Sequence, residues 1–383
     1  MIVDFIDLIN KMKILIIDTY YDKFINSFHK RLKTSSETLN FEELREMLLN
    51  QSFGGVSNFY SKNLKSLGVE AETIIFNDKI LQAKWLEMYG KGNFKKGFDL
   101  RSLSKADRVL NYSSAYKILN LQIDFYKPDV LYINSPAYFG PIFLNSAKKK
   151  VKLLVGQIAS KLPPVFFFKP YDLMISTLPN QVEFFKKHNI NAECLKLGFE
   201  ASILEKIESK EKKYPITFVG SFAGVHDSSI FLFEEVAKNF KDFYIWGHDF
   251  ERVKSDILKD RYKGEAWGLD MYNVLSNSLI TLNRHGFIEG AGKFATNLRL
   301  FEATGVGTML ITDQKDTLGE LFKVGEELET YASPLELIEK IKYYLENESA
   351  RKKIAEAGQK RTLLDHTYRK RMEELLVIIN KYI

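Results

Sequence analysis

The stretch GAGKFATNLRLFEATGVGTMLITD, residues 290–313, contains the elements that decide the fold of the C-terminal half. A glycine-rich loop comes first, and the short helical segment NLRLFEAT follows it, with Thr296 or Asn297 as the expected N-cap. Gly305 and Gly307 end the helix, because glycine readily adopts the left-handed conformation that closes helices. The apolar run TMLIT then predicts a buried strand.

Two charged residues stand in this helix among apolar ones. Arg299 and Glu302 are three positions apart and therefore share one helix face, while Leu298, Leu300 and Phe301 supply apolar packing. On a surface such a pair contributes only about 0.2–0.5 kcal/mol. A carboxylate can also accept two hydrogen bonds from a vicinal diol such as a ribose, and an arginine beside it can orient it or bind phosphate. The pattern therefore predicts a nucleotide site.

Short apolar runs alternate with amphipathic segments along the whole chain. This alternation is typical of parallel sheets covered by helices on both faces. The runs are residues 13–18, 71–77, 130–135, 151–157 and 173–177, then 216–221, 242–247, 279–283 and 308–312. A charged linker, EKIESKEKKYP at 205–215, separates the two series. We expect an α/β protein with two Rossmann-like doubly wound domains facing a cleft, residues 1–205 and 206–365, and an insertion at about 19–50.

Length and composition fit this reading. A chain of 383 residues exceeds the usual size of one hydrophobic core. Its net charge of +6 comes from scattered lysines without aromatic interleaving, which argues against nucleic acid. A solvated surface is the simplest explanation of these lysines, and anionic small molecules or acidic lipids are the alternative partners. Cys194 is the single cysteine, so no internal disulfide forms. Asp4 and Asp7 interrupt the first apolar run, which favours an amphipathic helix over a signal peptide. We expect a cytoplasmic location.

Polar residues end most of the predicted strands. Ligands of open parallel sheets bind beyond the carboxyl ends of the strands, so Asp18 and Ser221 are candidates to line a site. A simpler alternative holds for any one of them, namely that a strand stops where polarity begins. Gln157 differs because this large amide closes a strongly apolar run, so a buried position with a hydrogen-bond partner is expected.

Glycines precede two predicted helices. Gly54 and Gly55 in SFGGVSNFY would leave backbone N–H groups facing an anion, although a plain tight turn explains them equally well. In FVGSFAGVHDSS, Gly220 and Ser221 follow a strand and His226 could add a donor. Helix capping is the simpler explanation of the polar residues that follow.

These elements together resemble a known family. A glycine-rich loop, R-x-F-E-A-x-G-x-G, an apolar strand and an aspartate, with YKGEAWGLDMYNVLSNSLITLN upstream, resemble the C-terminal half of glycosyltransferases of the GT-B fold. The resemblance is closest to the CgeB-type (spore-maturation-like) branch of the group 1 glycosyltransferases. Its specific part runs from about Gly264 to Arg371, with weaker similarity in FGGVSNFYSKNL, GQIAS and PYDLMIST.

The resemblance implies roles for individual residues. Glu302 would bind the ribose hydroxyls of the donor, with Arg299 as its charge partner. The residues implied to contact the diphosphate or the base, or to face the donor, are Gly290, Gly292, Asn297, Ser221, Gly264, Trp267 and His285. A last helix, residues 366–383, would pack back on the N-terminal domain.

One departure concerns the catalytic residues. Many retaining members carry a second glutamate eight positions before the ribose-binding one, where this chain has Phe294, and Glu289 is out of register. The stereochemical outcome therefore stays open. An inverting enzyme would need a general base from the first half, for which Asp18 and His29 are candidates. No Asp-x-Asp element occurs, so neither a metal nor another cofactor is expected.

The sequence thus predicts a metal-independent glycosyltransferase. It would move a sugar from a nucleotide-diphosphate-sugar to a glycan, lipid or protein acceptor, in the cytoplasm or at the inner face of the membrane through peripheral contact. Two alternatives remain open at this point. One is a nucleotide-sugar epimerase, which shares the fold, and the other is a protein that binds nucleotide-sugars without catalysis.

Overall fold

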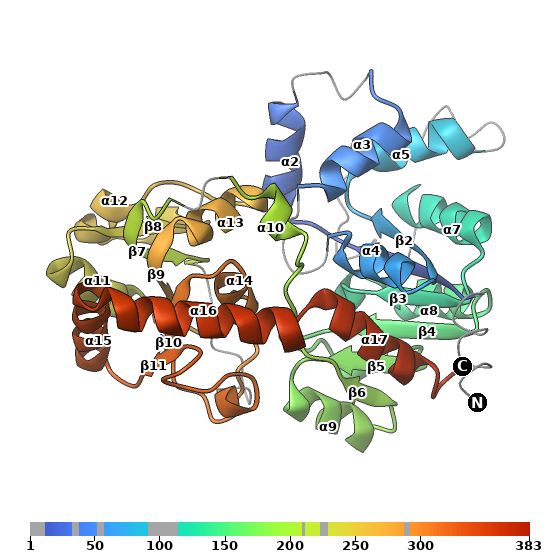
Figure 1. Ribbon diagram of the computed structural model, residues 1–383. Coiled ribbons are helices and arrows are strands. Elements are labelled where there is room, and N and C mark those ends of the chain that lie inside the picture. The colour runs from blue at the N-terminus through green and yellow to red at the C-terminus, as the bar shows by residue number, and fades with distance from the viewer. Residues whose placement is uncertain are drawn as a thin grey trace. The chain divides into compact units, whose positions relative to one another are not determined.

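The computed structural model describes residues 12–32, 38–51, 57–90, 114–208, 211–222, 229–286 and 292–383. The chain divides into two compact units (Figure 1). Unit 1 comprises Met1–Leu195 and Met372–Ile383, and unit 2 comprises Lys196–Arg371. The division falls before the charged linker at 205–215, and part of that linker is already strand, because β7 begins at Tyr214.

Unit 1 is built on a six-stranded sheet in the order β2-β1-β3-β4-β5-β6, in which every pairing is parallel. The strands are β1 (Lys13–Asp18), β2 (Glu70–Ile75), β3 (Val130–Ile133), β4 (Leu153–Gln157), β5 (Leu173–Ser176) and β6 (Ala192–Cys194). The five strands predicted for this half are confirmed. The sixth, β6, has only three residues and no apolar run of its own, so no sequence pattern announced it.

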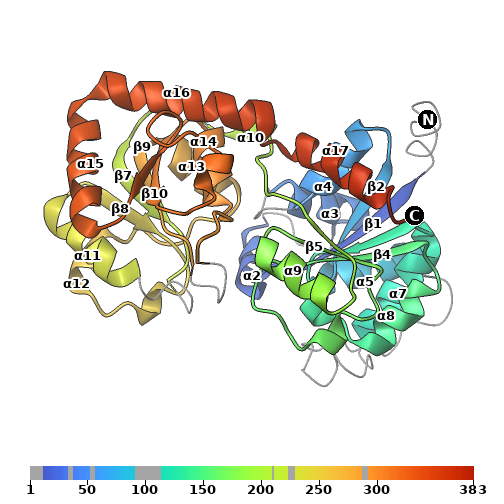
Figure 2. The ribbon, with the colours of Figure 1, turned by 90° about the horizontal axis from the view of Figure 1, so that it is seen from below.

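Helices cover both faces of this sheet. They are α2 (Asp22–Arg31), α3 (Phe41–Leu49), α4 (Phe59–Ser66), α5 (Lys79–Tyr89), α7 (Ser114–Tyr126), α8 (Pro141–Lys148) and α9 (Pro179–Lys187), with 3-10 turns at Pro136–Tyr138 and Val165–Phe167. Figure 2 shows α7 and α8 on one face and α4 on the other. The predicted insertion at 19–50 contains α2 and α3. Helix α3 begins with a capping box between Asn40 and Glu43 and packs on α5.

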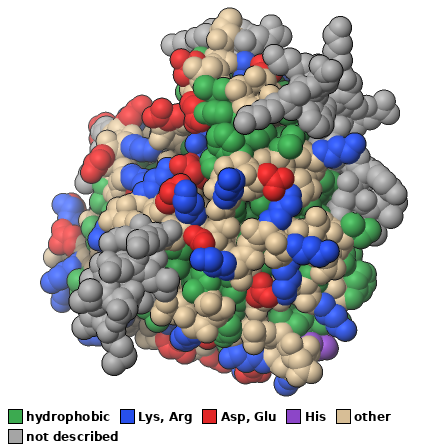
Figure 3. All heavy atoms as spheres, turned by 90° about the vertical axis from the view of Figure 1, so that its right-hand side faces the viewer, with side chains coloured by type: hydrophobic (Ala, Val, Ile, Leu, Met, Phe, Trp, Pro, Cys, Tyr) green, Lys and Arg blue, Asp and Glu red, His purple; other side chains and the backbone are tan. Residues whose placement is uncertain are grey.

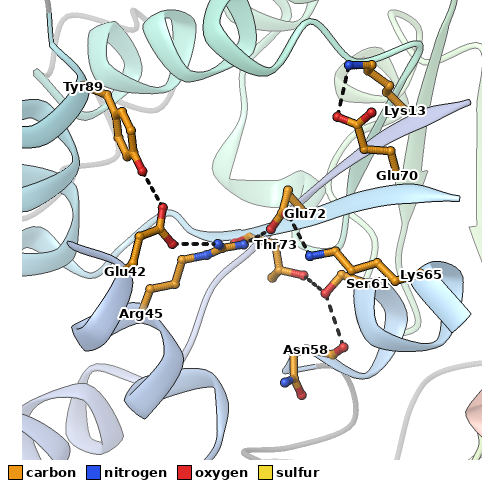
Figure 4. A network of polar contacts seen from close by, with 10 residues as sticks. All are labelled: Lys13, Glu42, Arg45, Asn58, Ser61, Lys65, Glu70, Glu72, Thr73 and Tyr89. Atoms are coloured by element: carbon orange, nitrogen blue, oxygen red, sulfur yellow. Dashed lines mark hydrogen bonds and ion pairs between the residues drawn. The ribbon is translucent and has the colours of Figure 1, made fainter. Parts of the chain in front are cut away.

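A polar network fastens α3 and α4 to the edge strand β2 (Figure 4). Glu72 on β2 pairs with Arg45 of α3 and, at 2.6 Å, with Lys65 of α4. Glu42 accepts a hydrogen bond from Tyr89 at 2.7 Å and lies 3.3 Å from Arg45. Figure 3 shows basic and acidic side chains interspersed over one face of the molecule.

Unit 2 carries a five-stranded sheet in the order β11-β10-β9-β7-β8, again parallel throughout. Its strands are β7 (Tyr214–Val219), β8 (Phe243–Trp246), β9 (Ser278–Asn283), β10 (Met309–Asp313) and β11 (Glu329–Tyr331). The four strands predicted for this half are confirmed. The short edge strand β11 was not predicted.

The helices of unit 2 form two layers around its sheet. They are α10 (Ile203–Lys206), α11 (Ser229–Asn239), α12 (Asp256–Arg261), α13 (Leu269–Ser276), α14 (Arg299–Gly305), α15 (Pro334–Glu346), α16 (Glu348–Asp365) and the start of α17 (Tyr368–Ile379), with 3-10 turns at Phe250–Arg252 and Leu318–Glu320. Helix α11 contacts α12 and α15, whereas α14 contacts α13 and α16. Right-handed crossovers explain the two layers, because the chain runs from β7 to β8 in one direction and then crosses back to β9 and on to β10 in the other.

Two glycines hold α14 in place. A Cβ on Gly305 would lie 2.4 Å from the Phe199 ring, so only glycine fits between them. Gly307 has φ +77°, the left-handed conformation expected at a helix end. Both support the predicted end of this helix.

The last helix, α17, starts in unit 2 and from Met372 onward belongs to unit 1. Beyond it, Lys381 and Tyr382 contact Glu193 of β6 at 3.3 and 3.1 Å. Among the described residues, no helix is both long enough and apolar enough to cross a bilayer.

Candidate functional site

The strand order of unit 2 creates a switch point between β7 and β9. Strand β7 pairs with β8 on one side and β9 on the other. The chain goes from β7 to β8 in one direction and from β9 to β10 in the other. Loops diverge beyond the carboxyl ends of such a strand pair, and open α/β sheets bind ligands there. Residues 220–222 follow β7, and residues 284–286 follow β9.

Arg299 and Glu302 lie at this switch point. Arg299 Nη2 donates to the Val219 carbonyl oxygen at 3.0 Å, at the end of β7. Arg299 Nη1 lies 2.9 Å from Glu302 Oε2, and the two side chains are only 10% and 5% exposed. The pair is therefore buried and tied to the sheet, unlike an ordinary surface pair. Within the described part of the chain, Arg299 Nε makes no hydrogen bond, which leaves a donor for a ligand.

The carboxyl group of Glu302 is held from two sides. Burial raises its pKa, while Arg299 and a hydrogen bond from Tyr272 oppose that rise. Burial also raises the pKa of Tyr272 well above its usual value, with Glu302 as the next cause. The phenol therefore keeps its proton and donates to the carboxyl group. Nothing in the sequence pointed to Tyr272, because it belongs to another helix, α13.

The loop before α14 is anchored to the end of β10. Lys315 Nζ donates to the Gly292 carbonyl at 2.8 Å, and the Ala295 N–H donates to Thr317 Oγ1 at 2.9 Å. Asn297 Oδ1 accepts from the Arg299 N–H at 2.9 Å. The N-cap of α14 is Leu298, without a side-chain cap hydrogen bond, so the N-cap predicted at Thr296 or Asn297 was placed too early in the chain. A Cβ on Gly292 would meet nothing within 4 Å, so open space lies beside the backbone there.

Beyond β8, the structure gathers the residues expected near the base. The Gly247 N–H donates to the Gly264 carbonyl at 3.0 Å, and a Cβ on Gly247 would meet the Gly220 carbonyl oxygen at 1.9 Å. Gly264 has φ +107° and open space around it, which only glycine tolerates well. Trp267 stacks on His248 at 4.9 Å and donates to Glu265 at 2.8 Å. Close backbone packing thus links the end of β7 to this loop.

His285 and Asp313 form a pair after β9 and β10. Asp313 Oδ1 accepts from the His285 N–H at 2.9 Å and contacts His285 Nδ1 at 2.7 Å. Asp313 Oδ2 lies 3.0 Å from Lys315 Nζ. Burial raises the pKa of Asp313, but hydrogen bonds from His285 and the charge of Lys315 outweigh it and lower the pKa overall. His285 was a candidate from sequence, whereas Asp313 was not.

Ser221 is half-buried directly after β7, beside Gly220. The other expected residues of this kind, Gly290, His226, Gly54 and Gly55, lie outside the described residues.

Asp18 lies at the corresponding switch point of unit 1, between β1 and β3. Its Oδ1 accepts from the Thr19 N–H at 2.8 Å, and the residue is buried. Burial raises its pKa to about 7, against the opposing effects of the hydrogen bonds from the Thr19 backbone and the Asn134 side chain. Asn134 lies at the end of β3. Asn134 was only one of many strand-end residues in the sequence.

His29 and Gln157 have local partners in unit 1. His29 Nε2 lies 2.9 Å from Asp78 Oδ2, and Asp78 Oδ1 also caps α5 through the Leu81 N–H. This contact joins α2 to α5. Gln157 is buried and its Oε1 accepts from Tyr60 at 3.1 Å and from Tyr132, so the predicted buried, hydrogen-bonded position is confirmed.

Residues 229–377 match a family model described as glycosyl transferase-like. This segment of the chain is similar to glycosyltransferases. This match covers β8 to β11 and the Arg299–Glu302 pair, and it confirms the enzyme class predicted from sequence. No curated protein sequence matches the chain.

Solved glycosyltransferase structures share the fold over nearly the whole chain. The Anabaena protein HepE, in complex with UDP-glucose, is 12% identical with a TM-score of 0.60, covering 97% of this chain and 100% of that one. A glycosyltransferase from Rickettsia africae is 15% identical with a TM-score of 0.58, and the coverages are 97% and 99%. Sucrose-phosphate synthase from Thermosynechococcus elongatus is 10% identical with a TM-score of 0.56 and the same coverages. The predicted α/β GT-B fold is thereby confirmed.

Among the described residues, no group of three or more His, Cys, Asp or Glu side chains is arranged to hold a metal ion.

Proposed function

We propose that the enzyme takes a sugar from a nucleotide-diphosphate-sugar bound by unit 2 and transfers it to a hydroxyl group of an acceptor bound mainly by unit 1. The observation that carries this is the buried Arg299–Glu302 pair at the switch point of unit 2. Two charged side chains are costly to bury, and among the described residues the Arg299 Nε–H has no hydrogen-bond partner. A polar ligand that uses them would account for the arrangement.

Each part of the donor has a suitable partner. The carboxylate of Glu302 accepts the two ribose hydroxyls, while Arg299 and Tyr272 hold it in position. The open backbone at Gly292 admits the diphosphate, and Gly264 with Trp267 offers a gap and an aromatic face to the base. Asp18, with its raised pKa, is the candidate group for the acceptor hydroxyl.

UDP is the first nucleotide to test. HepE, which shares this fold, is described in complexes with UDP and with UDP-glucose. We propose that the reaction needs neither metal nor other cofactor, since Arg299 and Lys315 bring positive charge to the region and no Asp-x-Asp element occurs in the sequence. Within the class we place the chain in the CgeB-type branch, on its R-x-F-E-A-x-G-x-G segment.

The acceptor is a glycan, a lipid or a protein. The sequence pI of about 8.9 suits work in the cytoplasm close to anionic lipid headgroups, so a lipid-linked acceptor or peripheral membrane contact fits the charge. No nucleic-acid partner is proposed.

A thermal-shift screen with UDP, GDP, ADP and their glucose conjugates tests the donor site. Binding at about 100 times the Kd adds about 2.7 kcal/mol to stability, so a true donor raises the melting temperature by several degrees. Glu302→Gln should abolish the rise in melting temperature. The matched control is Glu326→Gln, which should retain the rise, because Glu326 is exposed and its ion-pair partner is Lys323. If no nucleotide stabilises the wild type, the donor-site assignment fails.

Activity assays separate the remaining possibilities. A transferase releases free nucleoside diphosphate faster when an acceptor is added and hydrolyses the donor slowly without one. Interconversion of the donor sugar with no acceptor present would instead indicate an epimerase. Tight donor binding without turnover on glycan, lipid or peptide acceptors would indicate a non-catalytic binding protein.

A further inference from the structure

The His285–Asp313 pair offers a contact beyond those assigned to the ribose and the base. An ionised carboxylate can only accept hydrogen bonds, so the 2.7 Å contact requires that His285 Nδ1 carry a proton and donate it to Asp313. The second contact, from the His285 N–H at 2.9 Å to the same oxygen, fixes the backbone as well. Asp313 therefore fixes a proton on Nδ1 and the direction of the imidazole ring.

The opposite ring nitrogen has no partner. The His285 side chain is only 6% exposed, and its Nε2 is buried with no hydrogen-bond partner among the residues that the structure describes. Buried polar atoms in folded proteins are nearly always hydrogen-bonded, so an exception calls for an explanation. A ligand atom that pairs with Nε2 supplies one.

The surrounding charges favour an anionic ligand. Lys315 Nζ lies 3.0 Å from Asp313 and donates to the Gly292 carbonyl, which places a cation between the pair and the loop before α14. Arg284 precedes His285, and its carbonyl oxygen lies 3.4 Å from Asn297 Nδ2. Arg284 and Asp313 are also the charges that act on the Tyr331 phenol of β11. One carboxylate thus stands among two cations and a histidine.

We propose that His285, positioned by Asp313, donates a hydrogen bond from Nε2 to the sugar-linked phosphate of the donor. This rests on the proposed function and adds the contact for the leaving group. When the glycosidic C–O bond breaks, its electron pair passes to the phosphate oxygen. The acceptor oxygen forms the new bond to carbon, and its hydroxyl proton passes to a base, for which Asp18 is the candidate. The added negative charge strengthens the hydrogen bond from His285, and the proton stays on Nε2. His285 touches the leaving group, and Asp313 is a positioning residue.

Two substitutions of His285 separate this contact from a role in folding. In His285→Asn the side-chain amide can occupy the position of Nδ1 and keep the bond to Asp313, but nothing replaces Nε2. In His285→Gln the longer amide can place a donor near Nε2. His188→Asn is the control, because His188 is exposed in unit 1 and contacts only its own helix through Phe184.

Calorimetry with UDP, UMP and inorganic pyrophosphate on the full chain gives the readout. Loss of one charge-assisted hydrogen bond should weaken UDP binding about tenfold in His285→Asn. UMP lacks the second phosphate, so its affinity should stay within about twofold. His285→Gln should recover most of the UDP affinity. Asp313→Asn should weaken UDP binding, and in this variant the imidazole ¹⁵N signals should show that the proton is no longer fixed on Nδ1.

Each outcome decides a separate point. Equal weakening of UDP and UMP in His285→Asn, or no weakening at all, overturns the phosphate contact. A wild type that binds none of the nucleotides refutes the proposed donor site, and pyrophosphate then decides the anion contact by itself. Tighter pyrophosphate binding by the wild type than by His285→Asn supports the contact, and equal or absent binding overturns it.

Discussion

Arg299 joins a strand end to a helix: its Nη2 donates to the Val219 carbonyl oxygen at 3.0 Å, while its Nη1 lies 2.9 Å from Glu302 Oε2. The two contacts hold the guanidinium plane across the switch point of unit 2. Both partners are almost fully buried, so the stability of this region and its binding capacity depend on the same side chains.

Replacing Arg299 with methionine leaves the buried Glu302 without its cation. Breaking a buried ion pair in this way typically costs about 3–5 kcal/mol, so we expect a loss of this order in the free energy of unfolding at pH 8. Burial already raises the pKa of Glu302 in the wild type. The folded state therefore holds this proton more tightly than the unfolded chain, and stability is lost as the pH rises.

Urea denaturation of Arg299→Met at pH 5 and pH 8 measures this effect. From pH 5 to pH 8, the free energy of unfolding of Arg299→Met should fall by more than that of the wild type. The double variant Arg299→Met/Glu302→Gln should not show this additional fall. An unfolding free energy of Arg299→Met equal to that of the wild type at both pH values would contradict a buried, coupled pair.

Asp18 predicts a pH dependence of unit 1. Burial raises its pKa from 3.8 to about 7, so between these values the folded state binds a proton that the unfolded state releases. The resulting stability is complete below about pH 4, declines toward pH 7 and amounts to about 4 kcal/mol at most, at 1.36 kcal/mol per pKa unit. Asp18→Asn should flatten this slope in urea denaturation at pH 4.5 and 8. The exposed Asp124→Asn is the control and should keep the wild-type slope.

Gly305 tests the packing of α14. A Cβ at this position would lie 2.4 Å from the Phe199 ring, and overpacking of this kind costs about 1–3 kcal/mol. Gly305→Ala should therefore lower the midpoint of urea unfolding. Gly319→Ala is the matched control, because its Cβ would meet nothing within 4 Å. Similar midpoints for the two variants would show that Phe199 can move aside.

Metal removal tests the proposed neutralisation of the leaving group by side chains. The enzyme is dialysed against EDTA and assayed with UDP-glucose, or with whichever donor the screen identifies. The rate of nucleoside diphosphate release should stay within about twofold of that of the untreated enzyme, because basic residues act in place of a metal. A loss of activity that Mg²⁺ or Mn²⁺ restores would refute this proposal.

Local patterns in the sequence were sufficient for most of the fold. Apolar runs and helical spacing predicted nine strands, and the structure contains all of them at nearly the same positions. The same kind of pattern predicted the end of α14 and the shared face of Arg299 and Glu302. The short strands β6 and β11 escaped because three residues at a sheet edge carry no periodic signal.

By itself, the sequence determined the two α/β series, their strands and the helix that carries the Arg–Glu pair, because these depend on neighbours a few residues apart. The tertiary structure alone decided what the charged groups contact. Arg299 reaches Val219 across 80 positions, His285 reaches Asp313 across 28, and His29 reaches Asp78 across 49. Parallel pairing brings the carboxyl ends of distant strands to one edge of the sheet, and that pairing leaves no local pattern in the chain.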